Sequence, residues 1–572
     1  MPTLRQRTQN NHTKKEFRQL QQQSNSKQHE VIGDRGTPYA NNETEMSYIP
    51  SAFTAWKALF IVRLTAAFWS VISDCDETYN YWEPMHYLIY NKGFQTWEYD
   101  AKYGLRSYLY ILVHTLPAWI FAHVLQPNPM FVFFSVRCIL AAVCSACETY
   151  FYIGVTKEIG ANVGRITLGI LLFSAGMFIS STAFLPSTTS MYLCMLAHGA
   201  WFQQTYALAI FFTALSTFLS WPFAALLGLP IAADILLRRK RFTLFIQWSI
   251  ISTITILIPQ ILMDSQYYGK LTIAPLNIVT YNVLSDHGPD LYGTEPWTYY
   301  LFNGILNFNV AFILAILVWP LQGLLHLVVN LPQRSTQFLP VTMSQLALYS
   351  WFFVFWSQPH KEERFLFPIY PLICLAAAVS VDTLQKLFYA FCVRVQNRYY
   401  LEHSSWISVS FLVLTALVSV SRIVALYQNY HASMDLWMHA NSIGHSEKYF
   451  TLGKKMNVLD ISTYFHLTIF FFLFSEEKVS VCMGKEWYRF PSHFFLPENW
   501  QVKFVKSEFK GQLPQMYAEG EGATKLERSN FNDLNKEETD RYVKVSLEFD
   551  EIFQLCLNHS FTEYAVRMRL FG

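Results

Sequence analysis

Long apolar stretches recur along the chain, and they constrain its fold more than any other feature. The first runs from Phe53 to Ile72, close to the roughly 20 apolar residues that a helix needs to cross the hydrocarbon core of a bilayer. Only 15% of the residues are charged, whereas soluble domains carry about a quarter. We therefore expect an all-α polytopic membrane protein with about 11 to 12 transmembrane helices.

Residues 1–50 differ from the rest because they are polar and contain no apolar run. They lack the apolar region of a signal peptide, and their composition is typical of a disordered tail. Basic residues such as Arg18 and Arg35 precede the first span, which favours a cytosolic N-terminus. The glycosylation sequons at Asn11 and Asn42 would then stay unmodified.

A basic run from Arg238 to Arg241 sets the expected topology, because positive residues favour the cytosolic side. If the first span leaves the cytosol, the loop 73–104 is lumenal. Counting spans onward from the basic run places the turn from His360 to Arg364 in the lumen as well. The segment 107–126 contains Pro117, so it either crosses the membrane or lies along the lumenal face.

We divide the remaining chain into a transmembrane domain, 51–425, with a long first lumenal loop, 73–104, and a lumenal C-terminal domain, 426–572. The C-terminal part carries more charge, and its segments 479–482 and 502–505 resemble strands. We expect a small mixed α/β domain there.

Two features of the C-terminal domain depend on a lumenal location. Asn558 lies in a sequon that we expect to be glycosylated. Cys482 and Cys556 would meet an oxidising compartment, where they either pair or stay free.

Three acids stand where the first span ends: Asp74, Asp76 and Glu77. Glycosyl transfer needs a carboxylate that takes a proton from an acceptor hydroxyl, so these residues are candidates for a general base. The alternative is an ordinary helix start, since Asp and Glu also favour helix N-termini.

A charged run between two later spans contains His360, Lys361 and Arg364. The planar fork of an arginine and the point charge of a lysine both suit a lipid phosphate. An interfacial loop with paired charges remains the alternative.

Aromatic residues gather in a third stretch, 281–309, which includes Glu295, Trp297 and Tyr299. Together with Trp97 they are candidates for sugar binding, although an aromatic belt at the membrane interface explains much of the same pattern.

The order of several motifs resembles that of a known family. Ser-Asp-Cys-Asp-Glu-Thr-Tyr-Asn-Tyr-Trp-Glu-Pro-Met-His-Tyr-Leu occupies 73–88, and Phe184 to Ser187, His360 to Pro371 and Asn429 to Ala432 follow. The chain is similar over about 53–517 to the dolichyl-phosphate-mannose-dependent mannosyltransferases of the GT-C fold, glycosyltransferase family 22. Its Asp-Cys-Asp-Glu motif resembles that of the α-1,2-mannosyltransferases that build the N-glycosylation precursor, and not that of the glycosylphosphatidylinositol enzymes.

The resemblance implies an inverting transfer of mannose in the endoplasmic-reticulum membrane, at two steps of the pathway. The donor would be dolichyl phosphate mannose and the acceptor a dolichyl-diphosphate-linked oligosaccharide, with membrane lipid around the enzyme and no nucleic acid as partner. The resemblance also implies that Asp76 is the general base, and Asp74 and Glu77 are the alternative candidates for this role. His360, Lys361 and Arg364, with Arg106 in addition, would bind the donor phosphate, and no divalent metal or other cofactor would be needed.

Three other functions stay open at this point. Mannosyl transfer to a glycosylphosphatidylinositol precursor shares the chemistry and differs in the acceptor. A polytopic lipid or sugar transporter would show internal repeats and charges near the middle of the membrane. A non-catalytic subunit of a glycan-assembly complex would need none of the acids.

Overall fold

The computed structural model describes residues 49–284, 290–328, 338–393, 400–444, 471–474 and 479–543. From Pro50 onward these residues belong to one compact unit, which is described by itself. The predicted N-terminal tail up to residue 48 lies outside the described residues, as do Asn558 and Cys556. The predictions of disorder, glycosylation and disulfide pairing therefore stay predictions.

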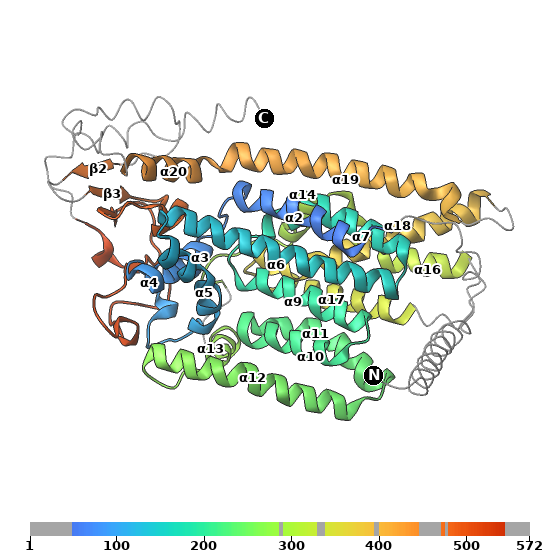
Figure 1. The fold of residues 1–572 in the computed structure, drawn as a ribbon, viewed down its shortest axis with the longest axis horizontal. Coiled ribbons are helices and arrows are strands. Elements are labelled where there is room, and N and C mark those ends of the chain that lie inside the picture. The colour runs from blue at the N-terminus through green and yellow to red at the C-terminus, as the bar shows by residue number, and fades with distance from the viewer. Residues whose placement is uncertain are drawn as a thin grey trace, which may run out of the picture. The chain divides into compact units, whose positions relative to one another are not determined.

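Helices of membrane-spanning length dominate the described residues, which confirms the predicted polytopic helical fold (Figure 1). Six are long and apolar enough to cross a bilayer, and a pair bent by 61° brings the number to seven. The six are α2 (Ala52–Trp69), α5 (Tyr108–Leu125), α6 (Pro129–Glu158), α12 (Phe242–Tyr268), the segment Glu363–Cys392 around α18 (Tyr370–Phe388), and α19 (Tyr400–Tyr430); the bent pair is α15 (Val310–Ile316) with α16 (Val318–Val328).

Further apolar helices are short or interrupted, which is why length alone gives fewer spans than the 11 to 12 expected. Proline explains part of this. Pro186 starts one of these helices, and Pro230 lies inside another. These helices are α7 (Ala161–Phe173), α9 (Pro186–Phe202), α10 (Tyr206–Leu215), α11 (Ala225–Ala233) and α14 (Tyr299–Phe308). A further helix, α17 (Phe338–Ser357), has 20 residues.

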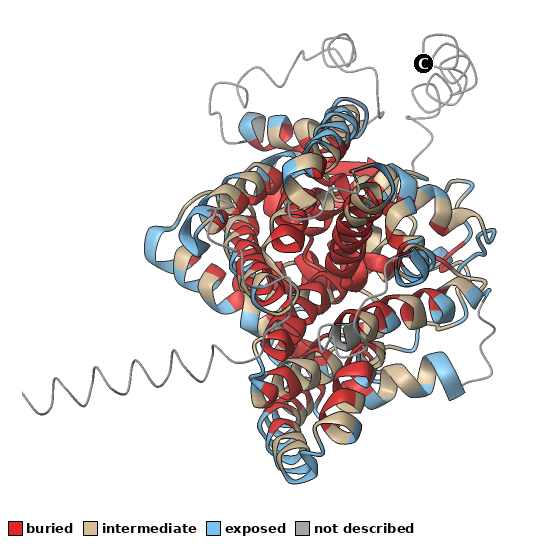
Figure 2. Cartoon of the chain, turned by 90° about the vertical axis from the view of Figure 1, so that its right-hand side faces the viewer, coloured by how far each residue is buried: buried red, intermediate tan, exposed pale blue. Residues whose placement is uncertain are grey.

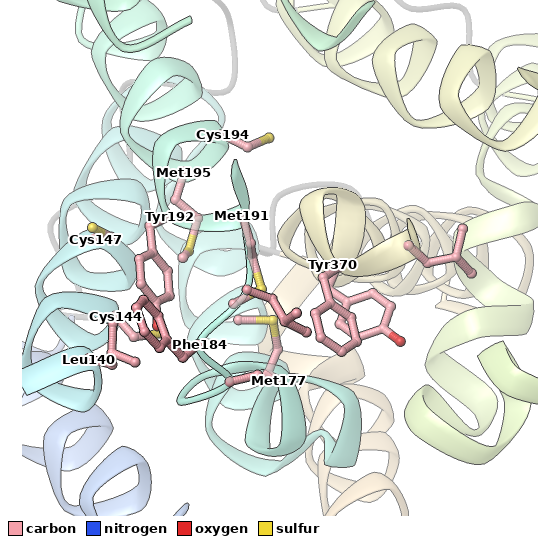
Figure 3. Packing of buried hydrophobic residues seen from close by; sticks show 14 of the residues in the cluster. Leu140, Cys144, Cys147, Met177, Phe184, Met191, Tyr192, Cys194, Met195 and Tyr370 are labelled. Atoms are coloured by element: carbon pink, nitrogen blue, oxygen red, sulfur yellow. The ribbon is translucent and has the colours of Figure 1, made fainter. Parts of the chain in front are cut away.

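Burial separates the inner helices from the outer ones, whose residues are largely exposed (Figure 2). The hydrophobic window of the span around α18 is 94% buried, whereas those of α12 and α19 are each 11% buried. Sulfur-containing and aromatic side chains fill the interior, among them Cys144, Met191 and Tyr192 (Figure 3). A buried ion pair between Arg63 of α2 and Glu148 of α6, 2.6 Å long, joins two helices of this interior.

Short elements gather at one end of the helical bundle, which we call the loop end (left in Figure 1). There the chain leaves α2 and forms short helical turns and a strand that occupy most of 75–99. These elements are α3 (Cys75–Glu77), the π-turn η1 (Thr78–Trp82), α4 (Glu83–Tyr90), β1 (Phe94–Gln95) and the 3₁₀ turn η2 (Trp97–Tyr99). Arg238 to Arg241 precede α12, whose 27 residues separate them from the loop end.

The C-terminal residues supply the strands that the sequence predicted. β3 (Val479–Met483) pairs antiparallel with β2 (Phe471–Phe474) and parallel with β4 (Trp500–Phe504). β5 (Gln515–Met516) pairs instead with β1 of the first loop. The C-terminal part is therefore built into the loop end through backbone hydrogen bonds as well as side chains.

Candidate active site

Asp74 and Asp76 are positioned by the short helix α3 that follows the first span. The side chain of Asp74 caps this helix, and its Oδ1 accepts a hydrogen bond from the backbone N–H of Asp76 at 2.9 Å. The capping interpretation of Asp74 is thus correct in its geometry. The cap uses only one carboxylate oxygen, so Oδ2 remains available to a charged partner.

That partner is Arg364, which comes from a turn nearly 300 residues further along the chain. Its Nε lies 3.0 Å from Asp74 Oδ2, and its Nη2 lies 2.6 Å from Asp76 Oδ2. The same guanidinium contacts Glu362. The predicted meeting of the acidic segment and the cationic turn is present in the structure.

Arg106 approaches Asp76 from another side. Its guanidinium forms a two-pronged pair with Glu98, at 2.8 and 3.0 Å, and donates to the hydroxyl of Tyr81 at 2.9 Å. Its Nη2 lies 3.7 Å from Asp76 Oδ2. Asp76 therefore stands between two arginines, and 30% of its side chain is exposed.

Among the described residues, the acids in contact with Arg106 and Arg364 outnumber these two arginines, and this excess of negative charge shifts the pKa values of the acids. Burial raises the pKa of Asp74 to about 7, against the opposing effect of Arg364 and with support from the charges of Glu362 and Asp76. Burial also acts on Glu362, but Arg364 and His360 outweigh it and lower the pKa of Glu362 to about 2. Asp74 is thus an acid of the network whose charge changes near neutral pH.

His360 and Lys361 hold a neighbouring loop instead of the carboxylates of Asp74 and Asp76. The two ring nitrogens of His360 lie 2.9 Å from the Gly293 carbonyl and 3.0 Å from Glu362 Oε1. The bond to Glu362 raises the pKa of His360. Lys361 is buried, and its ammonium donates to the carbonyls of Glu295 and Gln358 at 3.1 and 2.5 Å.

Glu77 lies beside Asp76 in sequence but bonds to the protein interior. Its Oε1 accepts from Trp82 Nε1 at 3.1 Å and from the backbone N–H of Phe184 at 3.0 Å. Only 2% of the residue is exposed. Its geometry is that of a structural carboxylate that ties α3 to the segment before α9.

The predicted sugar-binding residues lie in two environments. Trp97 is buried against Tyr103 and Tyr281, with ring centroids 5.1 and 5.2 Å away. Trp297 is 65% exposed, and the side chain of Glu295 is exposed as well. Tyr299 is partly buried at the start of α14.

Three residues of the network were missed by the sequence analysis: Glu98, Glu362 and Tyr81. Glu98 follows Trp97, and Glu362 stands inside the charged run itself, so both were visible as acids next to candidate residues. Nothing in the sequence indicated that Tyr81 would contact Arg106.

A small open pocket lies next to Arg106 and Tyr81. Its other walls come from the segments around α10, α12 and α13 (Ala274–Val279), and they are largely apolar, with Phe218, Leu219 and Ile278 among them. The pocket thus offers a cation at one wall and hydrocarbon at the others.

Asp74, Cys75 and Asp76 are also the described residues that could together hold a metal ion. Their ligand atoms lie within 4.8 Å of one another. Arg364 already occupies one oxygen of each carboxylate, so a cation would have to displace it or share those oxygens.

Comparison with known proteins decides the family. The model of the Alg9-like mannosyltransferase family matches residues 54–497. The chain belongs to this family. It is 46% identical to the human alpha-1,2-mannosyltransferase ALG9, over 90% of this chain and 82% of that protein, and 44% identical to the Drosophila melanogaster enzyme, over 88% and 78%.

Two further matches have lower sequence identity. GPI mannosyltransferase 3 of Debaryomyces hansenii is 25% identical over 68% of this chain and 69% of that protein. The crystal structure of ArnT from Cupriavidus metallidurans bound to undecaprenyl phosphate aligns with a TM-score of 0.48 and 12% identity, over 80% of this chain and 86% of that one. As a member of the Alg9-like family, the chain is a multi-pass membrane mannosyltransferase of the glycosylation pathway.

Proposed function

We propose that the protein transfers mannose from dolichyl phosphate mannose to a dolichyl-diphosphate-linked oligosaccharide, with inversion, forming α-1,2 linkages at two steps of N-glycan precursor assembly. The observation that carries the proposal is the position of Asp76, a partly exposed carboxylate between two arginines. A base beside fixed cations is the combination that transfer from a phosphate requires.

In this mechanism Asp76 accepts the proton of the attacking acceptor hydroxyl. The hydroxyl oxygen forms a bond to C1 of mannose while the bond from C1 to the phosphate oxygen breaks, and dolichyl phosphate leaves with the bonding electrons. Arg106 and Arg364 stabilise the charge that develops on the phosphate. Asp74 positions Arg364, and Glu77 supports α3 through its bonds to Trp82 and Phe184.

The donor phosphate would bind beside Arg106, at the edge of this pocket. A phosphate at the guanidinium would leave the apolar walls for the first isoprene units of the lipid. Lys361 then acts indirectly, because its bonds to two carbonyls fix the loop that borders the site.

The same arrangement supports a reaction without a divalent metal, since Arg364 already binds one oxygen each of Asp74 and Asp76. Transfer is expected to continue in excess chelator. Loss of activity in chelator, restored by Mg²⁺ or Mn²⁺, would contradict this part of the proposal.

We assign the enzyme to the endoplasmic-reticulum membrane, with the loop end in the lumen and the N-terminus in the cytosol. The basic run Arg238–Arg241, beyond the far end of α12 from the loop end, supports this orientation.

The proposed function is tested with purified protein, labelled dolichyl phosphate mannose and two synthetic acceptors, one from each pathway. We expect α-1,2-linked mannose on the dolichyl-diphosphate oligosaccharide and none on the glycosylphosphatidylinositol precursor. The reverse preference, or transport without transfer, would overturn the assignment.

A further inference from the structure

The loop that follows Leu291 is held over the acidic network by the charged turn. Besides the bonds from His360 and Lys361, the backbone N–H of Glu295 donates to the Pro359 carbonyl at 3.0 Å. Three hydrogen bonds between two short segments make a rigid clip. Gly293, with φ of +100°, adopts a backbone conformation that favours glycine at the centre of the clip.

The C-terminal part fixes the other side of this loop. Asn535 Nδ2 donates to the Leu291 carbonyl at 3.2 Å, and the hydroxyl of Tyr281 donates to the Asp533 carbonyl at 3.2 Å. Tyr292 therefore stands between two anchored carbonyls, that of Leu291 on one side and that of Gly293 on the other.

The side chain of Tyr292 is also anchored. Its hydroxyl lies 3.4 Å from the hydroxyl of Tyr281. Because Tyr281 donates its proton to Asp533, Tyr292 donates to Tyr281, and the oxygen of Tyr292 can still accept a hydrogen bond. Trp97 packs beneath Tyr281 and supports the pair.

Tyr292 nevertheless keeps 43% of its surface exposed. Burial of the hydroxyl raises the pKa of Tyr292, and so do the bond to Tyr281 and the charges of Glu98 and Asp76. The ring thus lies within the field of the acidic network. A tyrosine that is fixed at three points yet exposed offers a large contact area at little cost in conformational entropy.

The surroundings of Arg106 and of Tyr292 differ, and each suits a different substrate, the lipid donor or the glycan acceptor. The pocket with apolar walls lies beside Arg106, where the lipid phosphate fits. Tyr292 instead belongs to the side built by the polar C-terminal segment 531–535. This side suits a hydrated glycan.

We infer that Tyr292 binds the mannose-bearing arm of the acceptor glycan, and that the C-terminal segment, through Asn535 and Asp533, positions it. The inference rests on the proposed function and adds an acceptor-specificity residue to it. Tyr292 contacts substrate, whereas Asn535 acts through Leu291 as a positioning residue.

The test compares acceptor and donor KM for Tyr292→Ala, Tyr292→Phe and Asn535→Asp in purified full-length protein. Tyr292→Ala should raise acceptor KM about 3- to 10-fold, with donor KM unchanged. Tyr292→Phe keeps the ring and should have a smaller effect. Asn535→Asp removes the donor to Leu291 while tolerating the positive φ of 51°, and should also raise acceptor KM selectively.

Tyr488→Ala is the matched control, because Tyr488 is equally exposed, at 43%, and interacts with its sequence neighbours Glu486 and Arg489. Unchanged acceptor KM in Tyr292→Ala, or equal rises in both KM values, would overturn the inference. Wild-type protein without activity on the oligosaccharide acceptor would instead contradict the proposed function.

Discussion

Asp74 illustrates how one side chain combines a structural and an electrostatic task. One oxygen caps α3 and the other binds Arg364, so the same residue starts the helix and fixes the cation beside it. Since burial raises the pKa of Asp74 to about 7, the pair with Arg364 weakens as the pH falls through neutrality. Catalysis that needs this pair should therefore decline on the acidic side.

Glu362→Gln tests this electrostatic coupling. The negative charge of Glu362 helps to raise the pKa of Asp74, and its hydrogen bond raises the pKa of His360. Removing the charge lowers both pKa values, so the acidic limb of the kcat profile should move to lower pH. The measurement is kcat between about pH 5 and 9.

The adjacent acid provides the control. Glu363 accepts a hydrogen bond from Asn307 at 2.7 Å and, among the described residues, forms no hydrogen bond or ion pair with Asp74 or Arg364, so Glu363→Gln should leave the limb in place. An acidic limb that does not move in Glu362→Gln would show that the coupling does not govern catalysis.

At the scale of elements, α4 connects the first loop to the C-terminal part through one carboxylate. Glu83 is fully buried and accepts from the backbone N–H groups of Phe94 and His493 at 2.7 Å each, and it pairs with His493 Nδ1 at 2.6 Å. Burial alone would raise the pKa of Glu83, but His493 holds it below its usual value. The interaction joins segments 410 residues apart.

Glu83→Ala should therefore destabilise the loop end by about 3–5 kcal/mol, because it leaves buried donors without a partner. The expected result is a lower thermal midpoint of the detergent-solubilised protein and faster proteolysis of the C-terminal part. Glu508→Ala, at a side chain that is 85% exposed, should change neither. Equal midpoints for the two variants would contradict the role of Glu83.

At the scale of the whole molecule, the sequence predicted which charged segments meet but not how each side chain is used. Asp76 and Arg364 could be brought together because both follow helices that end on one side. Glu77 and Lys361 could not be assigned, since the direction of a side chain depends on packing partners such as Phe184 and Glu295 that are remote in sequence.

The strands were predictable only where a local sequence pattern sufficed. Alternating apolar residues indicated β3 and β4, whereas the pairing of β1 with β5 depends on the three-dimensional meeting of two loops. Glu98 and Tyr81, which the sequence analysis missed, likewise depend on the folded structure, because it brings both into contact with Arg106.

The orientation of the molecule can be tested with one engineered sequon. Glu527→Asn places Asn-Arg-Ser at 527–529, where the side chain of Glu527 is 60% exposed. If the loop end is lumenal, this variant should gain one glycan, detected as a mass shift reversed by a glycosidase. A glycan at Asn11 instead, with none at the new sequon, would invert the topology.

The most direct test of the account is the transfer rate of Asp76→Asn beside that of Glu77→Gln. The first variant removes the proposed base and should lower kcat by about 10²- to 10⁴-fold. The second keeps an oxygen that accepts from Trp82 and Phe184, so its kcat should stay within a few-fold of wild type. Full activity in Asp76→Asn, or a large loss confined to Glu77→Gln, would contradict the account.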